Sequence, residues 1–396
     1  MNRFLGSILL VAGTAIGAGM LALPVSTGFS GFLPSVALFV LCWIATFLSA
    51  LFFLQVLLVM KKETSMISMA GFTLGKWGKG FAWVFYLLLL YSLTAAYISA
   101  FSPMFLKLFY WIFHVQAPTW VGPLPFLGIF GLFVYLGTAS VDWVNRIFLT
   151  GKILFFLLFA VFLVPDLQVK LLRHIDMKPF LLGLPVVVTA FGFHTIIPSL
   201  ATYLDFQKKK LQIVLFVGSL FSLLIYITWE YLVLGSVPPN LLFETWKNGG
   251  TVVEPLTASV HQPMLVWIAN FFAFFAIITS FLGVSLGLVD FLRDGFHLPR
   301  RPSGRLLACV CAFIPPLFFV YIYPKGFILA LEYAGAFVAI LLIFFPALMV
   351  WKLKDKGFYN TGLGKAILLI VMGLSLVVFI LDILDKIGIL RPLLGF

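Results

Sequence analysis

Long apolar segments follow one another along almost the whole chain. Eleven of them can be distinguished, at residues 5–27, 32–59, 80–106, 122–139, 144–165, 180–202, 212–236, 263–290, 304–323, 326–350 and 364–384. A helix needs about 20 mostly apolar residues to cross a bilayer, whereas the strands of a membrane barrel alternate in pieces of about 10 residues. The continuous segments therefore predict an all-α polytopic membrane protein with eleven transmembrane helices.

The composition agrees with a membrane protein and excludes several partners. Hydrophobic residues make up 62% of the chain and charged residues only 10%, which leaves too little polar surface for a water-soluble fold. The net charge of +12 lies in short connections between apolar segments rather than on one basic face, so it indicates topology and not nucleic-acid binding. Cys42, Cys309 and Cys311 lie inside apolar segments without metal or redox spacing. The sequence predicts no metal and no cofactor.

The basic residues also predict how the chain is oriented, because loops that remain in the cytoplasm are rich in lysine and arginine. One set of alternate connections, which includes the N-terminus, carries Arg3, Lys61, Lys62, Lys76, Lys79, Arg146, Lys208, Lys209, Lys210, Arg293, Arg300, Arg301, Arg305, Lys352, Lys354, Lys356 and Lys365. The opposite set carries Lys107, Lys170, Arg173, Lys178, Lys247, Lys325, Lys386 and Arg391. The bias predicts a cytoplasmic N-terminus and, with eleven spans, a periplasmic C-terminus.

Two of the apolar segments contain residues that interrupt helices. The first has glycines at 13, 17 and 19 followed by Pro24, and the sixth has Gly192 followed by Pro198. Glycine costs about 1 kcal/mol in a helix interior and proline about 3 kcal/mol. Unwound backbone at membrane depth is tolerated where it lines a cavity or is buried in protein. Freed N–H groups there can bind a carboxylate and freed carbonyls an ammonium, as an amino acid zwitterion requires.

The two interrupted strings resemble each other: residues 14–17 are TAIG and residues 189–192 are TAFG. Matching interruptions in corresponding spans of two halves are typical of inverted-repeat transporters. We therefore predict a 5+5 repeat, with residues 1–165 as the first repeat, 180–350 as the second and 364–384 as an appended eleventh helix. The alternative is that Gly13 and Gly17 form a small-residue packing face between helices.

Several longer strings along the chain are distinctive: Gly6-Ser7, residues 11–24 (VAGTAIGAGMLALP), residues 93–99 (LTAAYIS), Val141-Asp142 with Asn145-Arg146, residues 191–194 (FGFH), residues 280–284 (SFLGV) and residues 333–335 (YAG). They resemble the hydroxy/aromatic amino acid permease family, and most closely its bacterial tyrosine-specific members. Together these strings extend over essentially the whole chain.

The resemblance implies an inner-membrane symporter of the amino acid–polyamine–organocation superfamily, which imports tyrosine or another aromatic amino acid with a proton. It implies that the Ala18 and Gly19 amides bind the substrate carboxylate. The carbonyls that would face the α-amino group are those of Thr14, Ala15, Ile16, Thr189, Ala190 and Phe191, and Gly17 and Gly192 complete the two strings.

Side chains beside the breaks are candidates for recognising an aromatic substrate. Phe191, Phe193 and His194 follow the second break, and Tyr91 and Tyr97 lie on the third span. Six residues at 100° each place the two tyrosines on different sides of their helix, so only one is expected to face the site. A site that hydrogen-bonds a phenol rejects phenylalanine, and we consider His194, Ser280 and Thr94 as partners of the phenol.

Ionisable residues inside spans are functional candidates because they are costly there. They are Lys152, His194, Glu230, Glu332 and Asp382. Burial disfavours the charged form of a lysine, and proton-coupled relatives in the superfamily place a lysine near position 152. We predict that Lys152 couples transport to protons, although its long stem would also let it reach the cytoplasmic interface.

The other ionisable residues receive weaker assignments. His194 titrates near neutral pH and is either a second proton carrier or a hydrogen-bonded core residue. Glu332 is expected at an outer gate, Glu230 in solvent near the outer surface, and Asp382 outside the repeat core.

Other functions remain open as alternatives. A sodium-coupled or tryptophan-preferring permease would share the same fold. A channel would need repeated polar stripes or rings of like charge, and an enzyme a cluster of facing catalytic groups. The spans predict neither, so no catalytic residue is assigned. The expected partners are an aromatic amino acid, a proton and the lipid bilayer.

Overall fold

The computed structural model describes residues 3–60, 64–260, 262–299, 301–353 and 357–394, with the side chains of 393 and 394 left out. Of the basic residues that predict orientation, Lys61, Lys62, Arg300, Lys354 and Lys356 lie outside these ranges. All regular secondary structure within the described ranges is helical. The predicted all-α class is therefore confirmed.

The helices of the first half are α1 (Arg3–Ala15), η1 (Ala18–Leu21), α2 (Leu23–Thr27), α3 (Phe32–Met60), α4 (Met66–Phe113), η2 (Thr119–Val121), α5 (Pro123–Leu136), α6 (Thr138–Leu163), η3 (Val164–Asp166) and α7 (Val169–Leu172). Those of the second half are η4 (Phe180–Gly183), α8 (Leu184–Ala190), η5 (His194–Ile196), α9 (Ile197–Tyr203), α10 (Lys208–Leu234), α11 (Pro239–Lys247), α12 (Val253–Ser259), α13 (Pro263–Gly295), α14 (Pro302–Ile322), α15 (Phe327–Val338), the π-helix η6 (Ala339–Phe344) and α16 (Phe345–Lys352). The chain ends with η7 (Gly357–Asn360), α17 (Gly362–Lys386) and α18 (Leu390–Leu394).

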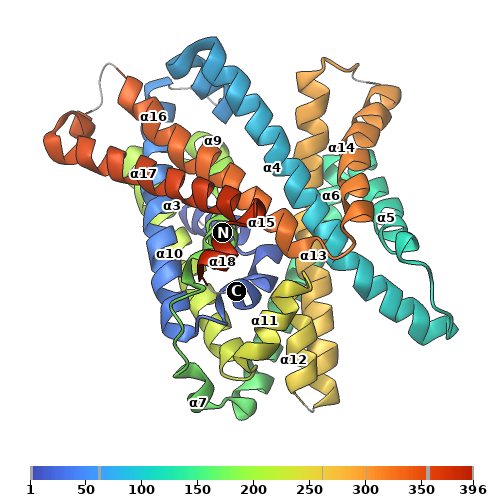
Figure 1. Cartoon of the computed structure of the whole chain (residues 1–396). Coiled ribbons are helices and arrows are strands. Elements are labelled where there is room, and N and C mark those ends of the chain that lie inside the picture. Colours follow the sequence, from blue (N-terminus) through green and yellow to red (C-terminus); the bar gives the residue numbers. More distant parts are fainter. Residues whose placement is uncertain (1–2, 61–63, 261, 300, 354–356, 395–396) are drawn as a thin grey trace.

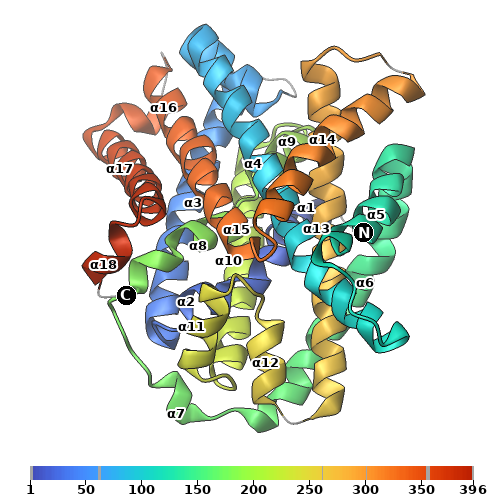
Figure 2. The ribbon, with the colours of Figure 1, turned by 45° about the vertical axis from the view of Figure 1, so that its right-hand side comes forward.

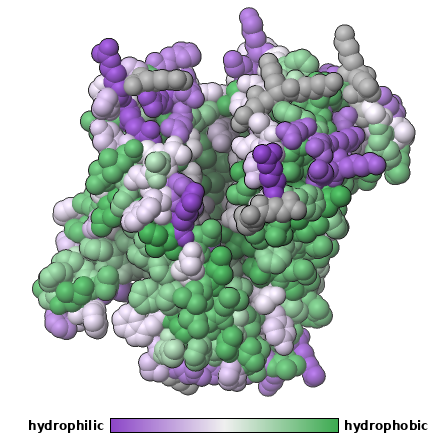
Figure 3. All heavy atoms as spheres, turned by 180° about the vertical axis from the view of Figure 1, so that it is seen from behind, coloured by the Kyte–Doolittle hydropathy of each residue, from purple (hydrophilic) through white to green (hydrophobic). Residues whose placement is uncertain are grey.

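Ten helical segments of the described chain are long and apolar enough to cross a membrane. The predicted first span, 5–27, is not among them, because it is divided into α1, η1 and α2. On the face that Figure 3 shows, a broad hydrophobic band crosses the middle of the molecule, and hydrophilic residues gather toward its two ends. The ten include the second broken span, Phe180–Tyr203, and together with the first broken span they are compatible with the eleven predicted crossings.

The long helices α4 and α13 cross the centre of the molecule and pack against each other. The flanking helices complete the bundle: α6 packs on α13, α15 on α4 and α8, and α10 on both α1 and α3. Figures 1 and 2 both place α17 at the edge of the molecule, and α7, α11 and α12 together at one end. The two broken spans are therefore enclosed by longer, continuous helices.

The third span is longer than the predicted 80–106. Helix α4 starts after Ser65, whose side chain accepts a hydrogen bond from the Ser68 amide, and it includes one non-helical residue, Gly75, with φ 75° and ψ −163°. Gly75 separates a short helix from the span itself, since a positive φ of this kind suits glycine. The extra residues therefore form a neighbouring element and do not lengthen the crossing.

Candidate functional site

The first break lies where the sequence predicts it. Helix α1 ends at Ala15 and η1 begins at Ala18, with Gly17 extended between them at φ −123° and ψ −163°. Pro24 then stands in the first turn of α2, where its missing N–H removes no helical hydrogen bond. The backbone groups around residues 15–18 therefore face neighbouring elements instead of their own helix.

The second break has the same construction. Helix α8 ends at Ala190, η5 begins at His194, and Pro198 stands in the first turn of α9. The two breaks lie against each other, because a Cβ added at Gly19 would lie 3.8 Å from the Ala190 Cα. A larger residue at position 19 would push the two breaks apart.

Lys152 reaches the first break from α6. Its side chain is only 6% exposed, and its Nζ donates a hydrogen bond to the Ile16 carbonyl oxygen at 2.9 Å. The amine is therefore directed into the protein at a freed carbonyl and does not extend to the cytoplasmic interface. A charge-assisted bond of this kind is about twice as strong as a neutral one.

Tyr226 on α10 joins the two breaks and was not identified from the sequence. Its buried hydroxyl lies 2.6 Å from the Ala15 carbonyl oxygen and 2.9 Å from that of Ala190. Trp229, three residues further along α10, donates from its indole nitrogen to the Met20 carbonyl at 2.8 Å. One face of α10 therefore holds the first break along its length.

Ser280 and Tyr97 complete the surroundings of the first break. The Ala18 amide donates to the Ser280 hydroxyl at 2.8 Å, and the Tyr97 hydroxyl lies beside that of Ser280. A Cβ at Gly17 would lie only 2.9 Å from the Ser280 Oγ, so the absence of a side chain at 17 makes room for this contact. The structure thus brings Ser280 and Tyr97 to the same break as Ala18.

The other candidates on α4 point elsewhere. The Tyr91 hydroxyl donates to the Cys311 carbonyl on α14 at 2.9 Å, and the Thr94 hydroxyl donates to Leu90 within its own helix. Of the two tyrosines, Tyr97 lies beside Ser280 at the first break, whereas Tyr91 bonds to α14. Thr94 uses its only hydroxyl hydrogen on the backbone, so it is not a free donor to a ligand.

The aromatic side chains after the second break are fully buried. The Phe191 ring packs edge-on against Tyr226, with centroids 5.2 Å apart, and the His194 ring stacks on Phe193 at 5.3 Å. Neither ring nitrogen of His194 has a hydrogen-bond partner among the described residues. The hydrogen-bonded core role predicted for His194 therefore has no partner among the described residues, and its role stays a prediction.

The two sides of the first break differ in exposure. On the α1 side Gly13 and Thr14 are exposed, and a Cβ at Gly13 would meet nothing within 4 Å. On the other side every residue from Met20 to Ser30 is buried. The α1 side of the break is therefore exposed at Gly13 and Thr14, whereas the α2 side is covered by protein.

Comparison with known proteins identifies the family. The sequence pattern of the tryptophan/tyrosine permease family matches residues 1–382. The chain belongs to this family. The permease is 35% identical over 413 residues to tyrosine-specific transport system 1 of Haemophilus influenzae, with 100% of both chains covered. It is 32% identical to the tryptophan-specific transport protein of the same organism, over 89% of this chain and 88% of the relative.

One solved structure has the same fold over nearly the whole length of both chains. The manganese transporter of Eremococcus coleocola superposes with a TM-score of 0.57 over 99% of the permease and 92% of that chain, at 14% sequence identity. This likeness concerns the fold alone. The relatives in sequence are transport proteins, so the permease is a membrane transporter and not an enzyme.

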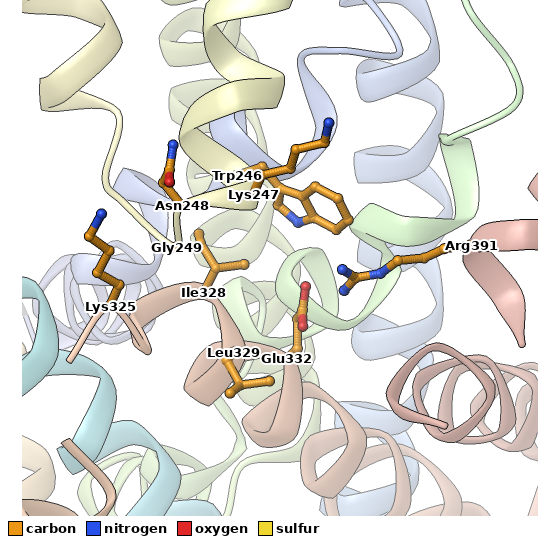
Figure 4. Close-up of a pocket in the computed structure, with 9 residues that line it drawn as sticks. All are labelled: Trp246, Lys247, Asn248, Gly249, Lys325, Ile328, Leu329, Glu332 and Arg391. Carbon is orange, nitrogen blue, oxygen red and sulfur yellow. The ribbon is translucent and has the colours of Figure 1, made fainter. Parts of the chain in front are cut away.

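Glu332 lies on α15 of the permease, at the end that carries α11. Its carboxylate pairs with Lys386 at the end of α17. Figure 4 shows Glu332 and Arg391 directed toward one cavity of about 280 Å³, beneath Trp246. The Arg391 guanidinium also binds Asp385 at 2.8 and 2.9 Å and stacks 4.6 Å from the Trp246 ring centroid. Glu332 therefore belongs to a charged cluster that joins α15, α17 and α11.

The expectation that Glu230 is solvated is wrong. Glu230 on α10 is 0% exposed, and its Oε1 lies 2.6 Å from the Thr27 Oγ1 on α2. Position in the sequence suggested solvent because Glu230 is only a few residues from the end of its helix. Helix α2, the second half of the first broken span, instead covers it.

One string of the sequence has the spacing of an enzyme motif. Residues 283–287 (GVSLG) have the G-x-S-x-G spacing of a hydrolase nucleophile. In the permease they lie inside the continuous helix α13, with Ser285 buried. The sharp strand-to-helix turn that exposes such a serine does not occur there, so the string carries no catalytic assignment.

Proposed function

We propose that this permease imports tyrosine together with a proton, with the paired breaks as its substrate site. The observation that carries the proposal is the contact between the Lys152 amine and the Ile16 carbonyl at 2.9 Å. A buried amine that is bonded to unwound backbone links a titratable group directly to the break. Proton uptake and the conformation of the first broken span are coupled through this contact.

The breaks offer both kinds of partner that an amino acid zwitterion needs. The Ala18 and Gly19 amides begin η1, and Ser280 already binds one of them at 2.8 Å. A substrate carboxylate takes the place of this hydroxyl or shares the amides with it. The carbonyls of Ala15, Ile16 and Ala190 are freed acceptors held by Tyr226 and Lys152, and they lie where an α-ammonium group is bound.

The proton acts through the strength of one hydrogen bond. Protonated Lys152 makes a charge-assisted bond to Ile16, and deprotonation leaves a weaker neutral bond. With the predicted orientation we assign the exposed side of the break, at Gly13 and Thr14, to the cytoplasmic side, and we infer an inward-facing state. Loss of the proton there loosens α1 and releases the substrate on the same side.

Tyrosine is the proposed substrate for two reasons. The tyrosine-specific relative is the more similar of the two named above, and it matches along the whole chain. Within the site, the His194 ring has two buried nitrogens without a described partner. A phenol hydroxyl that reaches this ring satisfies one of them, and phenylalanine lacks that group. A tryptophan preference is the second candidate, since tryptophan-specific proteins are also relatives.

The test is uptake of labelled tyrosine into proteoliposomes with an imposed proton gradient, at constant sodium, and with unlabelled tyrosine, tryptophan or phenylalanine as competitors. We expect accumulation only with the gradient, and competition by tyrosine above the other two. Accumulation that follows sodium instead would contradict proton symport. Stronger competition by tryptophan would transfer the proposal to that substrate.

Lys152→Ala examines the coupling residue itself. We expect it to abolish gradient-driven accumulation, because the amine that bonds to the Ile16 carbonyl at the break is removed, while exchange of internal for external tyrosine persists. Lys170→Ala, on the short helix α7, is the matched control and is expected to accumulate tyrosine normally. Normal accumulation by Lys152→Ala would refute the coupling role.

A further inference from the structure

Glu230 is a buried carboxyl that the proposed transport mechanism does not use. Tyr226 precedes Glu230 by four residues, so both lie on the same face of α10. Glu230, however, contacts the other, outer half of the first broken span. The helix α10 therefore touches this span at three levels: Tyr226 at Ala15, Trp229 at Met20 and Glu230 at Thr27. Glu230 marks the side of the break that is closed in this structure.

The hydroxyl hydrogens around Glu230 are too few for an ionised carboxylate. Thr27 has one hydrogen, and its Oγ1 lies 2.9 Å from the Leu23 carbonyl as well as 2.6 Å from Glu230. Ser35 also lies beside the carboxyl, but its hydroxyl is 2.8 Å from the Gly31 carbonyl and 3.1 Å from that of Thr27. Carbonyl oxygens only accept, so they compete with Glu230 for both hydrogens.

A neutral carboxylic acid resolves this shortage, because it brings a hydrogen of its own. It donates to the Thr27 hydroxyl, which then donates onward to Leu23. The second carboxyl oxygen, Oε2, has no hydrogen-bond partner among the described residues. An ionised carboxylate with one unpartnered oxygen in a fully buried position is costly, whereas a neutral acid is tolerated.

No cation compensates a charge at this position. Within the described ranges Glu230 forms no ion pair, and α2 and α3, which cover it, carry no charged residue. The charged groups on the other helices packed against α10 are Arg3 on α1, Asp142, Arg146 and Lys152 on α6, and Lys170 on α7, with Lys208, Lys209 and Lys210 at the opposite end of α10 itself. His174, in the connection after α7, is bonded at 2.9 Å to the Phe29 carbonyl.

We propose that Glu230 is a second proton-binding residue, neutral while the outer half of the first broken span packs on α10 and ionised when that half moves away and water enters. The inference rests on the alternating access proposed above. The proton enters and leaves on the outer side, so it is not carried across the membrane. Its binding sets how readily the outer side closes, and external acid favours closure.

The experiment measures tyrosine exchange in proteoliposomes at equal pH on both sides, from pH 5.5 to pH 8.5, in the Lys152→Ala background. Exchange requires repeated closure of the outer side but no proton coupling. We expect exchange to fall as the pH rises, toward the limit of about tenfold per pH unit for one proton. With E230Q added, which keeps a neutral hydrogen donor, we expect a flat profile.

Three further measurements separate the outcomes. E244Q, an exposed carboxyl on α11, is the control and is expected to keep the parent profile. T27V, which leaves the carboxyl in place, is expected to shift the profile without flattening it. E230Q alone is expected to accumulate tyrosine to the wild-type ratio under a proton gradient.

The inference is overturned if E230Q keeps the parent pH profile. It is also overturned if E230Q lowers the accumulation ratio as Lys152→Ala does, since Glu230 would then carry the coupled proton. A sodium dependence of exchange that E230Q removes would mean a cation site instead. If the wild type shows no gradient-driven accumulation, proton symport fails, but the exchange profile still decides the role of Glu230.

Discussion

The Tyr226 hydroxyl lies within 3 Å of a carbonyl oxygen in each of the two broken spans. Its single hydrogen is shared between these two acceptors, so its removal leaves both without this donor. For Tyr226→Phe we expect a loss of about 1–3 kcal/mol in stability and a marked fall in transport rate. Thermal unfolding in detergent and uptake in proteoliposomes measure the two effects.

Tyr91→Phe is the matched control for Tyr226→Phe. It removes a hydroxyl that also binds a backbone carbonyl at 2.9 Å, but between α4 and α14, away from both breaks. We expect a similar loss of stability and an unchanged transport rate per folded protein. Equal transport defects in the two variants would mean that the contact between the breaks has no special importance.

Gly13 and Gly17, four residues apart, differ in how much space the structure leaves for a side chain. A Cβ at Gly17 meets the Ser280 Oγ at 2.9 Å, whereas a Cβ at Gly13 meets nothing within 4 Å. We expect Gly17→Ala to displace Ser280 from the Ala18 amide and to weaken tyrosine binding about tenfold, the effect of one lost hydrogen bond. Gly13→Ala should bind normally. Equilibrium binding of labelled tyrosine tests both, and normal binding by Gly17→Ala would remove Ser280 from the site.

At the scale of single residues, the sequence predicts those residues that are unusual in an apolar membrane helix. Glycines and prolines inside apolar spans located both breaks, and a lysine at membrane depth located Lys152. Tyr226 gave no such signal, because a tyrosine in an apolar helix is common. Its role depends on how α10 is rotated against α1, which no local pattern encodes. Glu230 was noticed as a charge, but its burial depends on a neighbouring span.

The helix α17, which follows the predicted repeats, is joined to α15 by the pair of Glu332, which is buried, and Lys386, whose side chain is 15% exposed. Removing Glu332 leaves Lys386 with the longer contact to Asp385 at 3.9 Å, so we expect a loss smaller than that of a fully buried unpaired charge, which is about 3–5 kcal/mol. We expect Glu332→Gln alone to lower the unfolding temperature, and the double variant Glu332→Gln/Lys386→Met to recover most of the loss. The unfolding temperatures of the two variants in detergent test this coupling.

The same pair of variants tests the predicted gate. If Glu332 controls opening, the double variant remains stable but transports tyrosine at an altered rate, because the cluster with Arg391 and Trp246 no longer closes the cavity in the same way. A stable double variant with wild-type transport would assign Glu332 to the attachment of α17 only.

Element boundaries followed the sequence where the bilayer sets them. The predicted 32–59 and 364–384 agree closely with α3 (Phe32–Met60) and α17 (Gly362–Lys386). Helices outside the apolar segments were missed: α11 and α12 lie in the connection 238–263, where mixed composition gave no clear period. Hydropathy detects the part of a helix that crosses the bilayer. It therefore does not detect helices such as α11 and α12, which lie outside the apolar segments.

At the scale of the whole molecule, the orientation follows from the parity of the crossings. Eleven crossings place the two ends of the chain on opposite sides of the membrane, whereas ten would place them on the same side. The structure supplies ten candidate spans, one of which is the second broken span, and the first broken span as an eleventh, and a broad hydrophobic band covers the face that Figure 3 shows. The internal repeat stays a prediction, although α4 and α13, the third spans of the two predicted halves, do pack together.

Single cysteines at exposed positions test this topology directly. In a variant without Cys42, Cys309 and Cys311, we place one cysteine at a time at Trp77, Trp120 or Ile387, which are 83%, 57% and 60% exposed. The basic residues predict Trp77 inside and the other two outside. A membrane-impermeant maleimide added to intact cells should therefore label positions 120 and 387 but label position 77 only after lysis. Labelling of position 120 with protection of position 387 would contradict eleven crossings. Position 387 would then lie on the cytoplasmic side, like the N-terminus, so the number of crossings would be even.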